Sequence, residues 1–401
     1  MRIAFVTYEY PPDTGNGGIG TYTIQTATML AKYNWDIHVF AGSNTRQCLI
    51  NTEGVKVHWI KSKSAIDFCF NSVEVFKVEN ELMIFDIIES AEIHSNAWAI
   101  KKAFPHIPLV VRLHAPNWLV EHYKKHYVTF IAKLRFVLGS IRLGKPSAGY
   151  WRKYDFINDS DYKFTQMADV VSAPSDTMKK WAIKNWELPV SKIEVIANPF
   201  IASYELINLP IHFKNKNKEI VFFGRLNVLK GLVNATLAMK KILKEFPNYT
   251  FKVIGDDGAG INNMSMQYWM MQELQEFKDR VFFLKGLPYE NLPNAIAQAE
   301  IALLPSLFES FSYTCAEAMA AGKAVIGSYK TGMEDLIDNN NTGILINADN
   351  KIEIYEAIKF LIMNDQMRYS MAGNARKSIV EKFNSDKIFK EYFIFYKKTK
   401  I

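Results

Sequence analysis

The chain has few cysteines and no long apolar run. Its 401 residues include three cysteines, Cys48, Cys69 and Cys315. An odd number of thiols without metal-ligand spacing excludes a disulfide framework and predicts reduced thiols in a cytoplasmic setting. No run approaches the about 20 apolar residues of a membrane helix, and the apolar stretch 3–6 is too short for a signal peptide. We therefore expect a cytoplasmic protein that is soluble or lies at the inner face of the membrane.

Excess charge is also scarce outside one segment. The formal net charge is +7, and residues 121–155 hold eight lysines and arginines against two acids. The remainder is close to neutral, which argues against a nucleic-acid partner. Within 119–145, apolar residues recur at helical spacing between the cations and predict an amphipathic cationic helix. Two interpretations stay open: the helix packs its apolar face on the first domain, or residues 119–155 make a peripheral contact with an anionic membrane.

Short β-branched runs alternate with helical patterns along the whole chain. This alternation predicts parallel sheets, and the length predicts two domains. We expect an α/β fold of two doubly wound Rossmann-like domains facing a central cleft, where the carboxyl ends of the strands bind ligands. The expected strands are 3–7, 37–41, 55–60, 84–88, 109–113, 170–173 and 193–196, then 220–223, 251–254, 281–284, 301–304, 324–327 and 344–346.

A polar segment separates the two series of strands. It begins at Asn198-Pro199 and ends in the lysine-rich stretch 214–219, a composition typical of a linker and a domain edge. The boundary is therefore placed near residue 200, which gives domains 1–200 and 201–383.

The most informative run is 305–326, which predicts a strand end, a loop, a helix, a turn and a strand. Glu309 lies in the loop and Glu317 in the helix. Backbone N–H groups near Phe311, Ser312 and Tyr313 would meet a phosphate at the helix start. Carboxylates accept hydrogen bonds from hydroxyl pairs, so the two acids suit a nucleotide sugar. The alternative is that Glu317 caps or pairs locally while Glu309 is a solvated loop acid.

This run resembles the E-x7-E signature of the retaining family 4 glycosyltransferases, which have the GT-B fold. Other segments resemble the same family, stand in its order and extend over most of the chain. They are Gly17-Gly18-Ile19-Gly20, Val111-Arg112-Leu113-His114, Asn198-Pro199, Gly224-Arg225-Leu226, Lys230-Gly231, Ile254-Gly255-Asp256 and Gly286-Leu287-Pro288. In that family the last helix returns to the first domain, which implies that 384–401 packs on 1–200.

The resemblance implies roles for the charged residues of the second half. Glu309 would contact hydroxyls of the donor sugar and Glu317 would bind the ribose. Arg225 and Lys230, which follow Gly224, would neutralise the diphosphate. Two fixed cations stabilise a leaving group that gains negative charge, so no metal and no cofactor are implied. For the two cations the alternative is a solvated basic loop.

Further roles concern the loops. Gly286, Leu287 and Pro288 resemble the segment whose backbone reads the base. His114 would contact the donor sugar, the alternative being a satisfied histidine near the core. Gly17 and Gly18 would let the backbone approach the diphosphate and the acceptor. Asp159-Ser160-Asp161 matches a metal-binding D-x-D pattern, but it precedes a helical pattern, where aspartate is a common cap.

The implied activity is transfer of a hexose, with retention, from a nucleoside-diphosphate sugar to a saccharide or lipid-linked acceptor in surface polysaccharide or glycolipid synthesis. UDP-hexoses such as UDP-glucose are favoured by their frequency in the family. Two other functions remain: a nucleotide-sugar epimerase of the same architecture, which needs no acceptor, and a non-catalytic nucleotide-sugar-binding protein.

Overall fold

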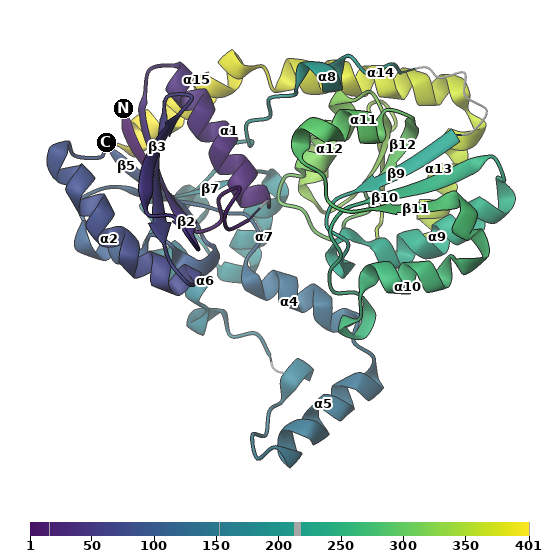
Figure 1. The fold of residues 1–401 in the computed structure, drawn as a ribbon, viewed down its shortest axis with the longest axis horizontal. Coiled ribbons are helices and arrows are strands. Elements are labelled where there is room, and N and C mark those ends of the chain that lie inside the picture. Colours follow the sequence, from purple (N-terminus) through teal and green to yellow (C-terminus); the bar gives the residue numbers. More distant parts are fainter. Residues whose placement is uncertain (16, 152, 212–217, 401) are drawn as a thin grey trace. The chain divides into compact units, whose positions relative to one another are not determined.

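The structure is a computed structural model that describes residues 1–15, 17–151, 153–211 and 218–400. It divides into two compact units (Figure 1). Unit 1 comprises Met1–Asn117, Asp155–Ile201 and Phe383–Ile401, and unit 2 comprises Trp118–Tyr154 and Ala202–Lys382. Each unit contains one predominantly parallel sheet, so the expectation of two Rossmann-like domains is confirmed.

The sheet of unit 1 has eight strands in the order β3-β4-β2-β1-β5-β6-β7-β8. Its neighbours are parallel except β3, which runs antiparallel to β4 at the edge. Strand β3 was not predicted. Strand β5 begins at Ile87, three residues after the start of the expected run 84–88. The strands are β1 (Arg2–Thr7), β2 (Asp36–Ser43), β3 (Cys48–Thr52), β4 (Val55–Lys61), β5 (Ile87–Ala91), β6 (Leu109–Arg112), β7 (Val170–Ala173) and β8 (Ile193–Val195).

Four helices in unit 1, α2, α6, α7 and α15, begin at side chains that satisfy free backbone N–H groups. Ser64 accepts a hydrogen bond from Asp67 N (3.1 Å), and Asp159 accepts bonds from Asp161 N and Tyr162 N (2.8 and 3.1 Å). The capping role expected for the D-x-D aspartate is confirmed. The helices are α1 (Gly18–Lys32), α2 (Ala65–Leu82), α3 (Trp98–Ala103), α6 (Ser160–Gln166), α7 (Asp176–Trp186) and α15 (Ser385–Thr399).

The sheet of unit 2 is parallel throughout, in the order β11-β10-β9-β12-β13-β14. Helix α9 packs against α10 and α13, whereas α12 packs against α14 (Figure 1). The strands are β9 (Lys218–Phe223), β10 (Tyr249–Ile254), β11 (Val281–Leu284), β12 (Ala299–Leu303), β13 (Ala324–Ser328) and β14 (Ile344–Ile346). The helices are α8 (Tyr204–Ile207), α9 (Leu232–Glu245), α10 (Met266–Glu273), α11 (Leu292–Ile296), α12 (Tyr313–Ala320), α13 (Lys351–Met363) and α14 (Asp365–Lys382).

The basic segment forms two helices, α4 (Asn117–His126) and α5 (Phe130–Arg142), where the sequence predicted one. Thr129 ends the continuity because its hydroxyl accepts a hydrogen bond from Ala132 N (3.3 Å) as the cap of α5. Residues 118–154 fall in unit 2, although the predicted domain 1–200 included them. Across the described ranges, every helix is too short or too polar to cross a bilayer.

Candidate functional site

In unit 2, the turn that follows β9 lies against the loop that follows β12. Gly231 has φ +66°, and a Cβ at this position would lie 1.8 Å from the carbonyl oxygen of Pro305. Leu307 N donates a hydrogen bond to Leu229 O (2.7 Å). A residue with a side chain would separate these segments, so glycine allows Lys230 to lie beside the loop 305–309.

Lys230 and Glu309 form an ion pair in this position, between Nζ and Oε1. The hydroxyl of Ser306 donates to the same oxygen (3.0 Å), and the backbone of Glu309 accepts a hydrogen bond from Gly332 N (2.7 Å). Both side chains are largely withdrawn from solvent, with exposures of 23% for Lys230 and 15% for Glu309. Glu309 is therefore held in place and paired, so the interpretation of a solvated loop acid does not apply to it.

Helix α12 begins directly after this loop. Ser312 adopts φ +85°, and its hydroxyl accepts a hydrogen bond from Cys315 N (3.3 Å), which caps the helix. Phe311 is buried, and its ring packs edge-on against that of Tyr313 at 5.2 Å. The first turn of α12 thus lies at the carboxyl end of β12, the position that the sequence assigned to a phosphate.

Glu317 lies in α12, one residue past its first turn. Burial raises the pKa of its carboxyl group to about 8, so the group is mostly protonated at neutral pH. Burial, and next the charge of Glu317, raise the pKa of the Tyr289 phenol to about 12, so the two side chains interact electrostatically. The acid expected to hold the ribose is therefore a neighbour of the loop expected to hold the base.

The loop 286–288, which follows β11, is hydrogen-bonded to the segment that follows β10. Gly286 N donates to Asp256 Oδ1 (3.2 Å), and a Cβ at Gly286 would lie 2.8 Å from the other carboxylate oxygen. Leu287, followed by Pro288, is 40% exposed. The backbone of this loop is consequently fixed while its surface remains accessible.

Gly224 and Arg225 complete the group in unit 2. Gly224 has φ +138°, and a Cβ there would meet Thr314 Cγ2 at 3.8 Å and Lys230 Cε at 4.0 Å. The side chain of Arg225 is exposed. Unit 2 therefore brings Gly224, Lys230, Glu309 and the start of α12 together beyond the carboxyl ends of β9 and β12, the two central strands of its sheet.

His114 follows β6 in unit 1 and is buried. Its backbone N–H donates to both carboxylate oxygens of Glu92 (2.8 and 2.9 Å), and its ring packs edge-on against Tyr22 at 5.3 Å. Burial, and next the charge of Arg112, lower the pKa of the imidazole to about 3. His114 is therefore neutral and suited to hydrogen bonding rather than to charge neutralisation.

Sequence reasoning missed the polar network around this histidine. Glu89 accepts hydrogen bonds from the hydroxyls of Tyr22 (2.5 Å) and Tyr396 (2.6 Å). Arg112 donates to Asn198 Oδ1 (2.5 Å) and lies over the ring of Tyr22. A small hollow of about 10 Å³ beside these groups has room for one water at most. Glu89 within the buried strand β5 was the available signal, since a buried carboxylate requires partners.

Gly17 and Gly18 lie at the start of α1. A Cβ at Gly17 would lie 3.3 Å from Glu9 Oε2, and one at Gly18 would meet nothing within 4 Å. The tightest approach in this loop is at Gly20, where a Cβ would lie 2.7 Å from Pro11 Cδ. Packing against Pro11 therefore requires glycine at position 20, whereas the space beside Gly18 is open.

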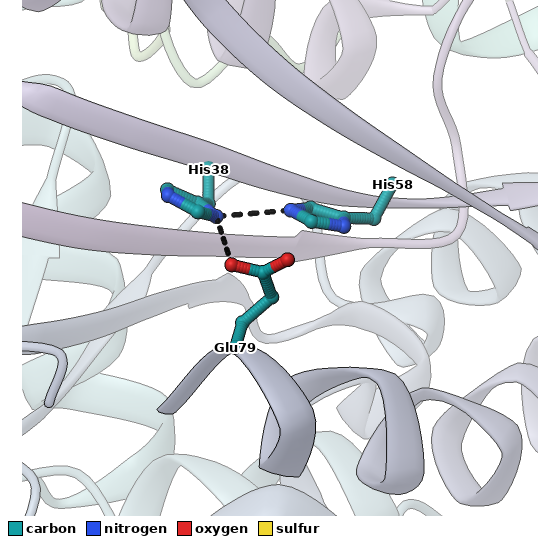
Figure 2. A group of neighbouring side chains, drawn as sticks. All are labelled: His38, His58 and Glu79. Carbon is teal, nitrogen blue, oxygen red and sulfur yellow. Dashed lines mark hydrogen bonds and ion pairs between the residues drawn. The ribbon is translucent and has the colours of Figure 1, made fainter. Parts of the chain in front are cut away.

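A second cluster in unit 1 joins β2, β4 and α2. His38, His58 and Glu79 place one ligand atom each within 4.8 Å of one another, with His38 Nδ1 2.9 Å from His58 Nε2 and 3.6 Å from Glu79 (Figure 2). Arg2 Nη2 lies 3.2 Å from His38 Nε2 and 3.1 Å from Glu79, and Lys56 Nζ lies 3.3 Å from His38 Nε2.

The electrostatics of this cluster favour a hydrogen-bonded network over a metal centre. Burial together with the cations Arg2 and Lys56 lowers the pKa of His38 to about 3 and that of His58 to about 4. The ammonium of Lys56 and the guanidinium of Arg2 beside these rings oppose a divalent cation as well. The cluster ties β1, β2 and β4 to α2.

Two Rossmann-like units, one with paired Lys230 and Glu309 before a capped helix, have the architecture of the GT-B glycosyltransferases. The matches to family models agree with this class: residues 16–202 match Glycosyltransferase Family 4, and residues 207–378 match Glycosyl transferases group 1. The chain belongs to the family 4 glycosyltransferases.

Relatives and solved structures extend the likeness over the full chain. An uncharacterized glycosyltransferase of Methanocaldococcus jannaschii is 24% identical over 414 aligned residues, covering 99% of this chain and 98% of the relative. Sucrose-phosphate synthase of Thermosynechococcus elongatus has a TM-score of 0.72 at 17% identity, covering 99% and 98%. HepE of Anabaena, solved in complex with UDP-glucose, has a TM-score of 0.68 at 18% identity, covering 99% and 100%.

Proposed function

We propose that the protein transfers a hexose from a UDP-hexose, UDP-glucose being the first candidate, to a saccharide or lipid-linked acceptor with retention of configuration. The observation that carries this proposal is the Lys230–Glu309 pair at the junction of the loops after β9 and β12. The similar structure of Anabaena HepE is described in complex with UDP and glucose, which supports the choice of donor.

The ion pair suggests how a donor would bind. A diphosphate would attract Lys230 Nζ away from Glu309, and the released carboxylate would then accept hydrogen bonds from hydroxyls of the sugar. Lys230 and the exposed Arg225 would neutralise the charge that develops as the bond from the sugar carbon to the diphosphate breaks. The acceptor oxygen forms the new bond, and the departing diphosphate takes its proton. Two cations in this position would replace a metal.

The remaining residues would orient the donor. Glu317 would hold the ribose beside the base loop 286–288, and the N–H groups of Ser312 and Tyr313 would face the phosphate. Neutral His114 would form a hydrogen bond to the sugar, while Gly17 and Gly18 would admit the diphosphate or acceptor. We place the reaction on the cytoplasmic side of the membrane, in surface polysaccharide or glycolipid synthesis.

A thermal-shift panel of UDP- and GDP-sugars tests the donor. A ligand at about 100 times its Kd stabilises the folded state by about 2.7 kcal/mol, so UDP-glucose should raise Tm while GDP-mannose should not. Transfer to candidate acceptors, followed by NMR of the new anomeric centre, tests the reaction. Donor conversion without an acceptor would indicate an epimerase, and binding without any conversion would indicate a non-catalytic binding protein.

A further inference from the structure

Helix α5 exposes an apolar face that unit 2 does not cover. None of its residues is buried, and Phe130, Leu138 and Ile141 are 71%, 57% and 57% exposed. At 100° per residue, Phe130, Leu134, Val137, Leu138 and Ile141 share one side of the helix. The helix lies apart from the sheet of unit 2 (Figure 1).

On another side of α5, Phe136 contacts the following segment of the chain, although its side chain is 47% exposed. Phe136 packs against Tyr150 with ring centroids 5.4 Å apart, and a Cβ at Gly149 would lie 2.6 Å from the ring of Phe136. The segment is also tied to the loop after β10. Thr129 N donates to Asn262 Oδ1 (2.8 Å), and Asn262 N donates to Tyr127 O (3.0 Å).

Cations flank the apolar face on both sides. On the helical wheel Lys133 lies about 60° before Phe130, and Arg135 and Arg142 lie about 120–140° beyond it. Residues 118–154 contain eight lysines and arginines and one acid, Glu121, which equals the net charge of +7 of the entire chain. An apolar stripe bordered by cations is the arrangement of helices that lie in the interface of an anionic bilayer.

A hollow beside α5 is also lined by cations. Its volume is about 320 Å³, and its lining includes Lys125, Lys133 and Lys153 but no carboxylate. Trp118 and Tyr154 stack at 4.1 Å and form part of its wall. Three ammonium groups around a hollow of aromatic rings fit an anionic group that carries an apolar substituent.

We propose that residues 118–154 dock on an anionic lipid surface. Helix α5 lies in the plane of the interface, its apolar face enters the acyl boundary, and the phosphate of a lipid headgroup occupies the hollow between Lys125, Lys133 and Lys153. The inference rests on the proposed function only in its purpose, which is to bring the enzyme to a lipid-linked acceptor. The contact itself requires neither donor nor turnover.

Flotation of the full chain with vesicles tests the docking. Binding to vesicles of phosphatidylglycerol and phosphatidylcholine in equal parts should exceed binding to phosphatidylcholine alone and should weaken with salt. The variant Lys133→Glu/Arg135→Glu/Arg142→Glu should lose at least about a hundredfold in partition coefficient, since each basic residue near the surface contributes about fivefold. Leu134→Ser/Leu138→Ser should also weaken binding to the vesicles. Lys125→Gln/Lys153→Gln should weaken it as well if a lipid phosphate occupies the hollow.

The matched control reverses three exposed lysines elsewhere, Lys63→Glu/Lys278→Glu/Lys377→Glu, with the same change in net charge. Equal loss in this control, or equal binding to neutral vesicles, would overturn the proposal. The UDP-glucose-induced rise in Tm should persist in every docking variant. Failure of the proposed function would abolish that rise and leave flotation unchanged, so the two failures are distinguishable.

Discussion

Lys230 and Glu309 neutralise each other in the structure, so substitution of either side chain is informative. Both are mostly buried, so removing either leaves the other charge with less compensation than a surface residue would have. The proposed donor binding would thus be linked to the local stability of the loops after β9 and β12.

Replacement of Lys230 by alanine should lower kcat/KM for transfer by about a hundredfold or more, because one preorganised charge is lost from the leaving group. Steady-state kinetics of the purified variant measures this effect, and circular dichroism confirms that it is folded. Lys240→Ala is the matched control, since its pair with Glu273 is exposed and spans 3.4 Å. Near-normal turnover of Lys230→Ala would refute the assignment.

Glu317 makes stability depend on pH. Its carboxyl group ionises near 4.5 in the unfolded chain and near 8 in the folded one, so the folded state binds more protons between these values. Stability from this group is complete below about pH 4.5 and is lost as pH rises towards 8.

Glu317→Gln should therefore be more stable than the natural chain at pH 8, and the difference should shrink towards pH 5. Urea denaturation at several pH values measures it, with exposed Glu290→Gln as the control. The same variant should bind UDP about tenfold more weakly if the carboxylate accepts ribose hydroxyls. An unchanged UDP affinity would remove the ribose role while leaving the pH effect intact.

Among the structural elements, the turn between β9 and α9 positions the cation. Gly231→Ala should reduce the free energy of unfolding by at least about 2 kcal/mol, because the added Cβ overlaps the Pro305 carbonyl at a left-handed position. Gly373→Ala, inside α14 with no neighbour within 4 Å, should instead add about 0.5–1 kcal/mol. Denaturant titration of both variants compares them, and a neutral Gly231→Ala would show that the turn relaxes freely.

Most strands could be predicted because parallel strands buried on both faces are continuous apolar runs. Strand β3 could not, since all five of its residues are exposed at the edge of the sheet. The expected run 84–88 was displaced because Ile84 is exposed and Glu89 is buried instead. Local sequence could not reveal this exchange, because one partner of Glu89 is Tyr396, 307 residues later.

The candidate site was predicted to different extents in the two units. The run around Glu309 has the expected order of loop, helix and strand, since turns and small-residue helices follow from nearby residues. The ion pair with Lys230 depends on packing between segments 79 residues apart. In unit 1 the burial of His114 and its contact with Glu92 depend on tertiary packing as well.

At the scale of the whole molecule, each unit is built from segments that are separated in the sequence. Helix α15 belongs to unit 1, where Tyr392, Phe395 and Tyr396 are buried and Tyr392 OH donates to Ala197 O (3.1 Å). Helix α15 therefore completes the core of unit 1, to which strand β1 also belongs.

Tyr396→Phe should lower the free energy of unfolding by about 1–3 kcal/mol, because Glu89 loses one of its two hydroxyl donors inside the core. Exposed Tyr268→Phe should change it by less than about 0.5 kcal/mol. The UDP-induced rise in Tm should survive Tyr396→Phe, since the proposed donor residues Lys230, Glu309 and Glu317 lie in unit 2. Loss of that rise would place donor binding elsewhere.

The late return of α15 also affects biosynthesis. Domains generally fold in the order in which the ribosome produces them, with the N-terminal domain first. The strands of unit 1 are synthesised before residues 202–382 of unit 2, whereas α15, which belongs with those strands, is synthesised afterwards. A nascent chain would hold a finished second unit before its first unit closes, so a chain terminated before residue 383 would be half folded.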